Sequence, residues 1–507
     1  MSVQFGKVVR LITLERFGPV IEKVVSFLFQ YGTNPLFYII KYTELPLSKV
    51  KESLCILIKY NLVEFVPNRN ESVANYTLKP DRILLMLRYP KYNNLIKKQF
   101  GDETEMIVEE VLHRGYCTAS ELLLKVMERL RKTKEEPVSF SQLKENFQSL
   151  VTAHYLQRMP YAKEDKPVPK LEILEHELYA MPEIDIKVLA NIEAGNETID
   201  NIPDKDVYWG ANFDRFHQDM RDKIIVTAFT RKLDENAGEF VKLLLRQMYI
   251  RTQPWADLSN PVPILEIKDI VKRQDTHKEL IAYFDQYVNV IEQDSSQIIR
   301  KAGEASGGSF QIFMKETFEK FAWETVEQMV LEKYDTKAAR IFRLVKLKKY
   351  IEPDEIQRLA MIPAKEAKRL SYLLLEDNFL QVQELRKAAS NNGPNKSFTL
   401  FHINLDQIVR TTLEHCYKSL FNIMTRKNHE KEVNKRIIVK KQRVDTIVMD
   451  MKEKGAEEDQ IKDIEEMITP PEREILSRVE VTLNKLNIVE IELDETIFLL
   501  QMYLAYH

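Results

Sequence analysis

The sequence predicts a mainly α-helical protein with small β-hairpins, built from repeated winged-helix modules and long C-terminal helices. Two observations predict this. A helix followed by a hairpin recurs along the chain, and three apolar stripes with helical spacing lie beyond residue 403. The 507 residues include only 13 glycines, far below average usage of about 7%, which favours helices and disfavours glycine-rich phosphate loops.

The clearest unit spans residues 46–78. Pro46 precedes a segment with Val50, Leu54, Leu57 and Ile58 at helical spacing, which predicts an amphipathic helix ending near Asn61. Residues 62–66 then alternate between apolar and polar, 67–70 break the chain, and 73–78 resume a strand pattern. A helix followed by a β-hairpin is the second half of a winged helix.

The same pattern recurs 317 residues later, so that Pro363 and Asn378 correspond to Pro46 and Asn61. The segment 379–383 matches the first hairpin strand, 391–395 predicts a turn, and 397–403 predicts the return strand. The two segments are therefore predicted to be internal repeats of one fold.

Two fainter copies complete the modular pattern. One aligns with the first unit at an offset of 93 and has an unclear hairpin, and the other has a helix near 280–291 and a glycine-rich tip at 303–308. A proline-rich and acidic stretch at 160–206 predicts a linker with one or two strands. Beyond residue 403, apolar stripes interrupted by Gly455 and Pro470 predict an antiparallel helical hairpin or bundle.

Composition and charge restrict the function classes. The net charge is −3, 30% of residues are charged and 44% are hydrophobic, which suits a folded multidomain chain. No apolar run approaches the roughly 20 residues that a transmembrane helix needs, and no signal peptide is predicted, so the protein is expected to be intracellular. The three cysteines, Cys55, Cys117 and Cys416, are predicted to be ordinary buried thiols.

No catalytic constellation emerges from the sequence, so we expect no enzymatic activity, no cofactor and no metal. Asp204 and Asp206 resemble a pair of metal-binding acids, but a solvated turn is the better interpretation of this segment. His415 and Cys416 are adjacent, and neighbouring helix residues do not face one another, so core packing explains them better than ligation.

Nucleic-acid binding is the better-supported function, because a winged helix offers a helix for the major groove and a wing for the backbone. Basic residues occupy such positions, although they can also be ordinary solvated side chains, and the modules can instead bind protein. The candidate DNA-binding residues are Lys49, Lys51, Arg69, Lys125, Arg129, Arg131, Lys132, Lys365, Lys368, Arg369 and Lys387. The spread of these residues predicts weak binding to phosphates, without sequence preference.

Several segments carry a resemblance to a known family. They are MLRYPKY (86–92), YWGANFDRFH (208–217), AARIFRLV (338–345), AMIPAKEAK (360–368), HCYKS (415–419), IEEMIT (464–469) and DETIFLL (494–500). In order and over nearly the full length, the chain resembles the winged-helix subunit of DNA-directed RNA polymerase III, the largest member of its three-subunit initiation subcomplex.

The resemblance implies four tandem extended winged-helix modules and a C-terminal coiled coil. Expected boundaries are 1–90 for the first module, 91–190 for the second with a linker strand, 191–206 for a short acidic linker, 207–330 for the third module, 331–402 for the fourth, and 403–507 for the coiled coil. Related animal sequences can carry a long basic insertion between the second and third modules. Here residues 190–206 are short and acidic, which removes support for a DNA-binding role of that segment.

The resemblance also implies a nuclear, non-catalytic role in transcription initiation: promoter opening, DNA handling on the clamp side, and contact with an initiation factor. Products are transfer RNA, 5S ribosomal RNA and other small RNAs. Expected partners are other polymerase subunits, especially the two smaller members of the subcomplex and the clamp, with weakly bound single- or double-stranded DNA and no membrane. The alternative is a winged-helix scaffold or DNA-binding regulator of another nuclear assembly.

The C-terminal region is expected to dock the subunit onto its assembly, because three apolar stripes exceed what one hairpin buries. The alternative for the last stripe, Leu493 to Leu504, is that it folds back on the chain's own modules.

Overall fold

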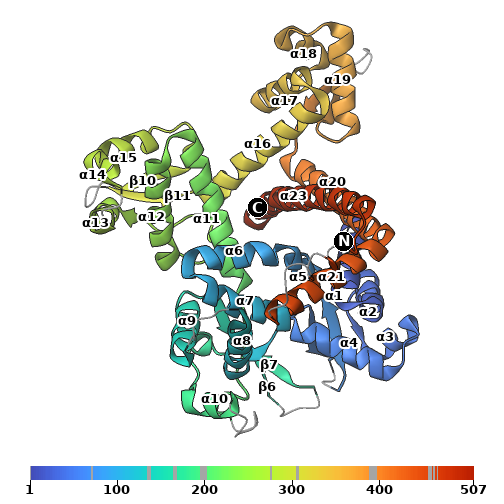
Figure 1. Ribbon diagram of the computed structural model, residues 1–507. Coiled ribbons are helices and arrows are strands. Elements are labelled where there is room, and N and C mark those ends of the chain that lie inside the picture. Colours follow the sequence, from blue (N-terminus) through green and yellow to red (C-terminus); the bar gives the residue numbers. More distant parts are fainter. Residues whose placement is uncertain are drawn as a thin grey trace. The chain divides into compact units, whose positions relative to one another are not determined.

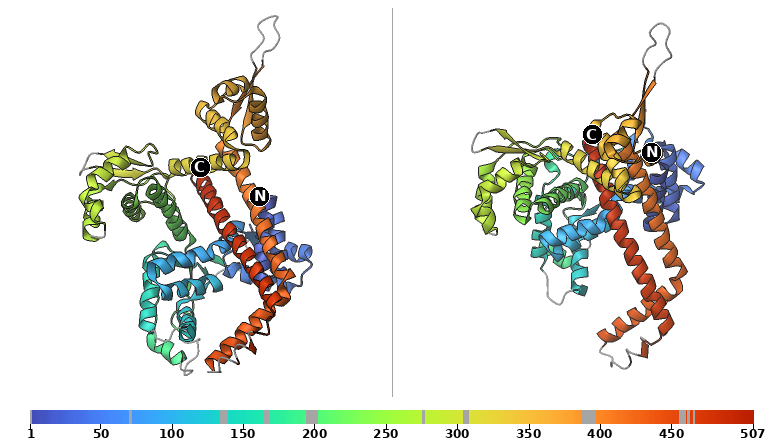
Figure 2. Two further views of the ribbon diagram at one scale, coloured as in Figure 1. Left: turned by 45° about the horizontal axis from the view of Figure 1, so that its top comes forward. Right: turned by 90° about the horizontal axis from the view of Figure 1, so that it is seen from above.

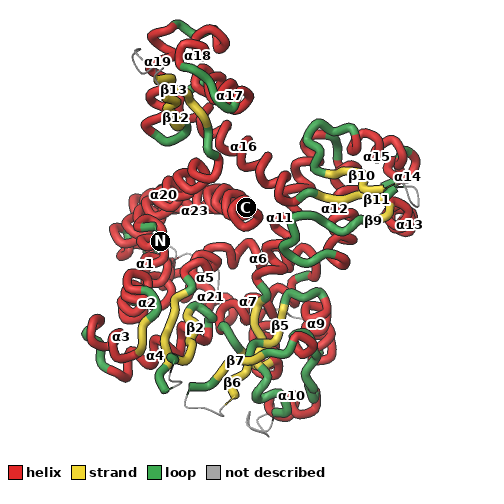
Figure 3. The backbone as a smooth tube through the Cα atoms, turned by 180° about the vertical axis from the view of Figure 1, so that it is seen from behind, coloured by secondary structure: helices red, strands yellow, loops and turns green. Residues whose placement is uncertain are grey.

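The computed structural model describes residues 2–69, 72–133, 139–163, 168–193, 202–274, 277–303, 308–386, 397–454, 460, 463–464 and 466–507. The chain divides into two compact units, Met1–Lys223 and Ile224–His507, which are treated separately below. Helices dominate both units (Figure 3). Each small sheet is antiparallel. The predicted mainly α fold with small hairpins is confirmed.

The first module contains a helical bundle and a three-stranded sheet with the order β1-β3-β2. Its elements are α1 (Val3–Phe17), α2 (Pro19–Tyr31), β1 (Asn34–Pro35), α3 (Leu36–Thr43), α4 (Leu47–Lys59), β2 (Val63–Pro67), β3 (Ala74–Leu78), α5 (Pro80–Leu85) and the 3-10 helix η1 (Met86–Arg88). As predicted, α4 buries Val50, Leu54 and Leu57, and β2 and β3 form the wing. Ile58 is only partly buried.

The second module repeats this order and adds a hairpin. It contains α6 (Tyr89–Phe100), α7 (Asp102–Arg114), β4 (Cys117–Thr118), α8 (Ala119–Thr133), α9 (Phe140–Thr152), β5 (Leu156–Arg158), β6 (Tyr161–Lys163), β7 (Lys170–Glu172), η2 (Glu175–Glu177), α10 (Ile186–Glu193) and β8 (Tyr208–Ala211). β8 lies between β4 and β5 in the sheet.

The position of β8 differs from the expected boundary at 206/207. Trp209 on β8 is fully buried and packs edge-on against Phe147 of α9. The Tyr92 hydroxyl lies 3.0 Å from His217 Nε2 on the following helix. Residues 207–217 therefore complete the second module. β8 fills the place between β4 and β5, where its backbone groups pair with both strands.

The third module lies in the second unit. Its elements are α11 (Phe213–Lys232), α12 (Glu235–Arg251), β9 (Val262–Pro263), α13 (Ile264–Gln274), α14 (Lys278–Ala282), α15 (Phe284–Glu292), β10 (Ile299–Gly303) and β11 (Ser309–Ile312). α11 begins in the first unit and ends here. The single helix predicted near 280–291 is two helices, which meet at Tyr283.

The fourth module contains α16 (Met314–Tyr334), α17 (Thr336–Lys348), α18 (Pro353–Ala360), α19 (Ala364–Glu376), β12 (Gln381–Arg386) and β13 (Ser397–His402). Figure 2 shows β12 and β13 as an extended wing. Because α16 is continuous and packs on α17, this module begins before the expected position 331.

The C-terminal region is a helical hairpin, formed by α20 (Leu405–Val433), α21 (Lys435–Glu453) and α23 (Pro470–Tyr506). α20 and α23 lie side by side and antiparallel, since the Tyr503 hydroxyl donates to Asp406 at 2.5 Å while Lys427 pairs with Glu490 at 2.6 Å (Figure 2). The predicted interruption at Pro470 is the first residue of α23, where proline is tolerated.

The last apolar stripe folds back on the chain. Ile497, Leu500 and Tyr506 on α23 are buried, and Tyr506 stacks on Phe318 of α16 with 5.6 Å between ring centroids. This end of α23 is thus part of the core of the second unit, as the alternative interpretation of the sequence expected. Exposed apolar residues remain in the preceding part of α23, at Val481, Ile488, Val489 and Ile491.

Candidate nucleic-acid interface

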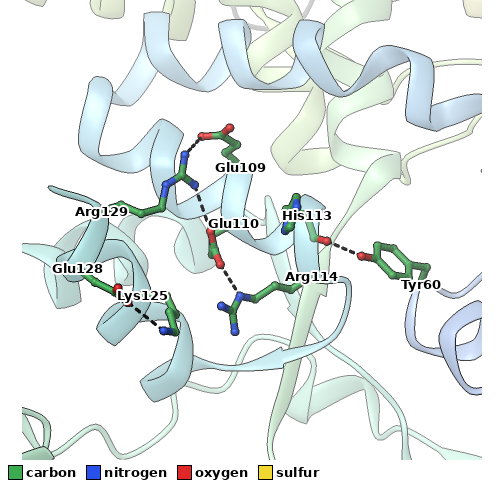
Figure 4. A network of polar contacts seen from close by, with 8 residues as sticks. All are labelled: Tyr60, Glu109, Glu110, His113, Arg114, Lys125, Glu128 and Arg129. Carbon is green, nitrogen blue, oxygen red and sulfur yellow. Dashed lines mark hydrogen bonds and ion pairs between the residues drawn. The ribbon is translucent and has the colours of Figure 1, made fainter. Parts of the chain in front are cut away.

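The densest basic cluster, on α8, is neutralised by carboxylates of its own module (Figure 4). Lys125 and Lys132 both pair with Glu128, at 2.9 and 3.2 Å. Arg129 binds Glu109 at 2.8 Å and Glu110 at 3.1 Å. These contacts link α7 to α8, so the cluster supports the module's packing and offers little uncompensated charge to a phosphate.

Arg131 is also paired, with Glu193 of α10 at 2.8 Å. Burial alone would raise the pKa of Glu110, but hydrogen bonds from Arg114 and Arg129 lower it below its usual value. The carboxylate of Glu110 is therefore charged at neutral pH and holds both guanidinium groups.

The two modules of the first unit meet beside this network. The Tyr60 hydroxyl donates to the carbonyl of His113 (Figure 4). The Tyr116 N–H donates to the carbonyl of Lys59 at 3.1 Å. Gly115 between them has a φ of +74°, and a Cβ there would lie 2.6 Å from the Lys59 carbonyl oxygen. Only glycine fits this contact, which fixes α4 against the end of α7.

On the first module, Lys49 and Lys51 are exposed on the first turns of α4. Among the described residues neither forms an ion pair. Glu52, however, lies beside them and accepts a hydrogen bond from Ser48. Arg69 is exposed at the turn of the wing, where its N–H binds the side chain of Asn68 at 2.7 Å. The α4 face is thus only weakly basic.

On the fourth module, Lys365, Lys368 and Arg369 are exposed on one face of α19. No carboxylate in the described part of the chain pairs with them, and the nearest acid in sequence, Glu366, is held by Lys337 of α17 at 2.7 Å. Among the predicted residues, these three form the group whose positive charge is least compensated. Lys387 lies outside the described residues.

Sequence analysis missed Tyr372, which is 60% exposed on the same face of α19. Tyr372 follows Arg369 by three residues and Lys368 by four, and this helical spacing could have placed it on the same face from the sequence alone. An exposed tyrosine beside three cations can contact a sugar or a base edge while the cations bind phosphates. This face of α19 is the candidate interface.

Asp204 is not in a solvated turn, contrary to the sequence-based interpretation. It is 1% exposed, and its two carboxylate oxygens accept from the N–H and hydroxyl of Ser120, at 2.8 and 2.6 Å. A buried carboxylate at the start of α8 caps the helix and suits its dipole. Both oxygens of Asp204 are engaged in this cap, whereas Asp206 is exposed.

Two further expectations need correction. Cys55 is exposed on α4, whereas Cys117 and Cys416 are buried as predicted. Burial raises the pKa of the Cys117 thiol to about 12, mainly by desolvation, so this thiol is inert at neutral pH. His415 is exposed and is not part of the core.

Within the described residues, no group of three or more His, Cys, Asp or Glu side chains could hold a metal ion. Over the same residues, none of the helices combines the length and the apolar character that crossing a bilayer requires.

Comparison with known proteins assigns the whole chain to one family. Family models match four segments: the RNA polymerase III subunit RPC82 helix-turn-helix domain at 7–68, RNA polymerase III subunit RPC82 at 145–320, the POLR3C C-terminal winged-helix domain at 326–403, and the helical hairpin domain of DNA-directed RNA polymerase III subunit RPC3 at 436–499.

Full-length relatives agree with these models. The chain is 36% identical to DNA-directed RNA polymerase III subunit RPC3 of Bos taurus and of Homo sapiens, with 98% of each chain covered. It is 32% identical to RPC3 of Danio rerio, with 99% of each chain covered. The chain therefore belongs to the family of DNA-directed RNA polymerase III subunit RPC3, an accessory and non-catalytic subunit of the polymerase.

Proposed function

We propose that this chain acts in the nucleus as a non-catalytic subunit of RNA polymerase III at transcription initiation, where it helps to open promoter DNA and engages an initiation factor. The observation that carries the proposal is the likeness to RPC3 over nearly the whole of both chains. Transfer RNA, 5S ribosomal RNA and other small RNAs are the expected transcripts. Other subunits of the polymerase, especially two smaller subunits and the clamp, are the expected partners.

The proposed DNA contact is α19. Lys365, Lys368 and Arg369 pair with no carboxylate among the described residues, so they can replace the counterions of DNA phosphates. Each phosphate contact adds about 0.9 to the slope of log affinity against log salt. Because the face has no compact set of Arg with Asn or Gln for reading bases, affinity is expected to depend strongly on salt and little on sequence.

Duplex binding by the full chain tests this contact. The change of Lys365, Lys368 and Arg369 to Glu should weaken binding to a 20-base-pair duplex and reduce the salt slope by roughly three. The matched control reverses three α8 residues, Lys125, Arg131 and Lys132, whose charges are already compensated. An equal loss in both variants would indicate general charge repulsion and would count against an α19 contact.

A second test addresses assembly. Deletion of all of 403–507 would remove the α23 residues that cover α16, and would expose Phe318 and its neighbours. A sharper variant replaces residues 435–469 by a short linker, which keeps α20 and α23. Loss of co-purification with the polymerase core, with the module helices intact by circular dichroism, is expected. Stoichiometric assembly of this variant would show that residues 435–469 are not the docking surface, and would leave the exposed apolar residues of α23 and the modules as the candidates.

The alternative function is a winged-helix scaffold of another nuclear assembly. Cross-linking mass spectrometry of the endogenous complex separates the two: cross-links to polymerase subunits are expected, and their absence would favour the alternative.

A further inference from the structure

Thr469 is the single serine or threonine of the sequence that a proline follows, although the chain has 20 prolines. It is the N-cap of α23, which packs on α21 (α21 and α23 in Figure 1). The side chains of Thr469 and Pro470 are both exposed. A Ser-Pro or Thr-Pro pair is the minimal acceptor of proline-directed protein kinases, so the sequence offers such enzymes one acceptor.

The backbone at Thr469 has the extended form in which kinases bind their acceptors. Its φ and ψ are −65° and 152°, and the following proline disfavours the helical region at this position. Pro470 and Pro471 have no N–H to donate. The first turn of α23 is therefore held by the amides of Glu472 and Arg473, which donate to the side chain and the carbonyl of Thr469. A terminal turn with so few hydrogen bonds opens at little cost, and its opening frees the acceptor segment.

Packing holds Thr469 beside a cation of α21. The preceding Ile468 is 9% exposed and packs with Val444 and Val448 of α21. The Lys440 ammonium lies 2.7 Å from Oε2 of Glu472, and the same oxygen accepts from the Thr469 N–H at 3.0 Å. One carboxylate oxygen thus separates Lys440 from the Thr469 backbone, which places this ammonium within reach of a phosphate on the threonine.

A phosphate on Thr469 meets one anion and one cation. It carries a charge of about −1.5 to −2 at neutral pH and three acceptor oxygens. Glu472 is also charged, because hydrogen bonds from Lys440 and from the Thr469 N–H lower its pKa to about 2. The flexible Glu472 side chain can turn toward solvent, however, whereas Lys440 and the positive end of the helix dipole both favour the larger charge.

We propose that Thr469 is a phosphorylation site for a proline-directed kinase, and that the phosphate replaces Glu472 as the partner of Lys440. In the transfer, the hydroxyl oxygen of Thr469 bonds to the γ-phosphorus of ATP and the bond from that phosphorus to the β–γ bridging oxygen breaks. ADP leaves, and the hydroxyl proton passes to the kinase. The phosphate then ties the start of α23 to α21 more firmly than the carboxylate does. This inference concerns the hairpin itself and does not depend on the proposed function.

The first experiment incubates the full chain with ATP and a kinase of the cyclin-dependent or mitogen-activated class. Intact mass measures the phosphate incorporated, and tandem mass spectrometry locates it; incorporation at Thr469 is expected. Pro470→Ala keeps the acceptor hydroxyl and should slow incorporation by about ten-fold or more. The matched control is Ser139→Ala, which removes the exposed N-cap hydroxyl of α9 that Phe140 follows, and should change nothing.

The second experiment compares hydrogen exchange in the phosphorylated and unmodified chains. The amides of 472–476 should exchange about two- to five-fold more slowly after phosphorylation, as expected for negative charge added at a helix N-terminus. Lys440→Met should remove most of this gain. Lys452→Met, which removes an exposed cation farther along α21, is the control and should retain it.

Several results would contradict the inference. Absence of phosphate from Thr469, or equal incorporation into Pro470→Ala, would overturn the phosphorylation site. Unchanged or faster exchange after phosphorylation would overturn the transfer of Lys440, and faster exchange would mean that repulsion from Glu472 prevails. In cells, phosphopeptide mapping of the free and the assembled chain should find phosphate on Thr469. Its absence from both, at a detection limit set with a synthetic phosphopeptide, would likewise overturn the site.

Discussion

The first and fourth modules share one backbone and differ in their surfaces. α2 and α17, α3 and α18, and α4 and α19 begin and end at positions exactly 317 residues apart. The residues with positive φ obey the same offset: Gly18 and Asp335, Gly32 and Lys349, Glu44 and Met361, and Asn61 and Asn378. On the surface, by contrast, the exposed Phe37 and Tyr38 of α3 correspond to Asp354 and Glu355 of α18. The exposed Lys365 and Arg369 of α19 correspond to Ser48 and Glu52 of α4.

This difference shows which residues specify the fold. Apolar positions at helical spacing are kept, and so is the positive φ at the end of each helix, although only the pair Asn61 and Asn378 keeps its residue type. Packing depends on the first feature and chain reversal on the second. The exposed positions carry no such constraint and have diverged toward two surface chemistries. The same fold can therefore present exposed aromatic side chains on α3 of the first module and exposed cations on α19 of the fourth.

The largest expected effect tests the shared core. Leu57→Ala and Leu374→Ala should each reduce the free energy of unfolding of their module by about 2–5 kcal/mol, since both side chains are fully buried and leave a cavity. Native-state hydrogen exchange of the α4 and α19 amides measures this loss module by module. The exposed Tyr372→Ala serves as the control, with an expected change below about 0.5 kcal/mol. A loss in only one module would mean that the two cores are not equivalent.

The next effect tests the shared turn. Asn61 and Asn378 follow their helices with φ of 55° and 62°. Asn61→Val and Asn378→Val should each cost about 1–2 kcal/mol, because a β-branched residue is strained in this conformation. Glycine at the same positions should cost far less, and the comparison of Val with Gly in thermal unfolding isolates backbone strain from lost side-chain contacts.

A surface swap tests whether the divergence is functional. Lys365→Ser and Arg369→Glu give α19 the residues found at the equivalent positions of α4, Ser48 and Glu52. Duplex affinity should fall and the salt slope should decrease by about two or more, with no change in unfolding. The reciprocal change, Ser48→Lys with Glu52→Arg, should raise the slope. Affinity that follows neither swap would show that the modules do not bind duplex through these helices.

The smallest effect concerns pH and the second module. Because the folded pKa of Glu110 lies below its ordinary value near 4.5, its ion pairs stabilise the module above that pH, and this contribution is lost as the pH falls through the lowered pKa. Glu110→Gln should remove about 0.5–1 kcal/mol at pH 7 and flatten the acid side of the stability profile. Glu145→Gln, at an exposed position of α9, is the control and should leave the profile unchanged. If the unfolding free energy of Glu110→Gln depends on pH as that of the wild type does, then Glu110 does not contribute to the loss of stability in acid.

Much of the architecture could be predicted because its signals are local. Helical spacing, the asparagine at the end of each helix and the repeat at 317 located α4 and α19 and both wings. The copy at offset 93 proved equally regular, since α9 has the same length as α4 and ends before His154, with a φ of 65°. The wing of this copy could not be recognised in the sequence, because β5 does not pair with the next strand in the chain. It pairs with β8, which follows only after the β6–β7 hairpin and α10.

The candidate site was predicted only in part. Sequence placed Lys365, Lys368 and Arg369 on one helix, where the structure finds them exposed. It did not separate these residues from the α8 cluster, because a count of charges along the chain does not reveal that Glu109 and Glu193 approach α8 from other helices. Asp204 was misassigned for the same reason, since its partner Ser120 lies 84 residues away.

By itself, the sequence determined the class of fold, the repeated modules, the C-terminal helices and the family, because each is encoded by the period and order of nearby residues. Tertiary structure alone decided which strand closes the second sheet, which cations are neutralised, and that the end of α23 packs on α16. These outcomes depend on contacts between residues distant in sequence, where pairing and burial are set by the packed chain and no local pattern specifies the partner.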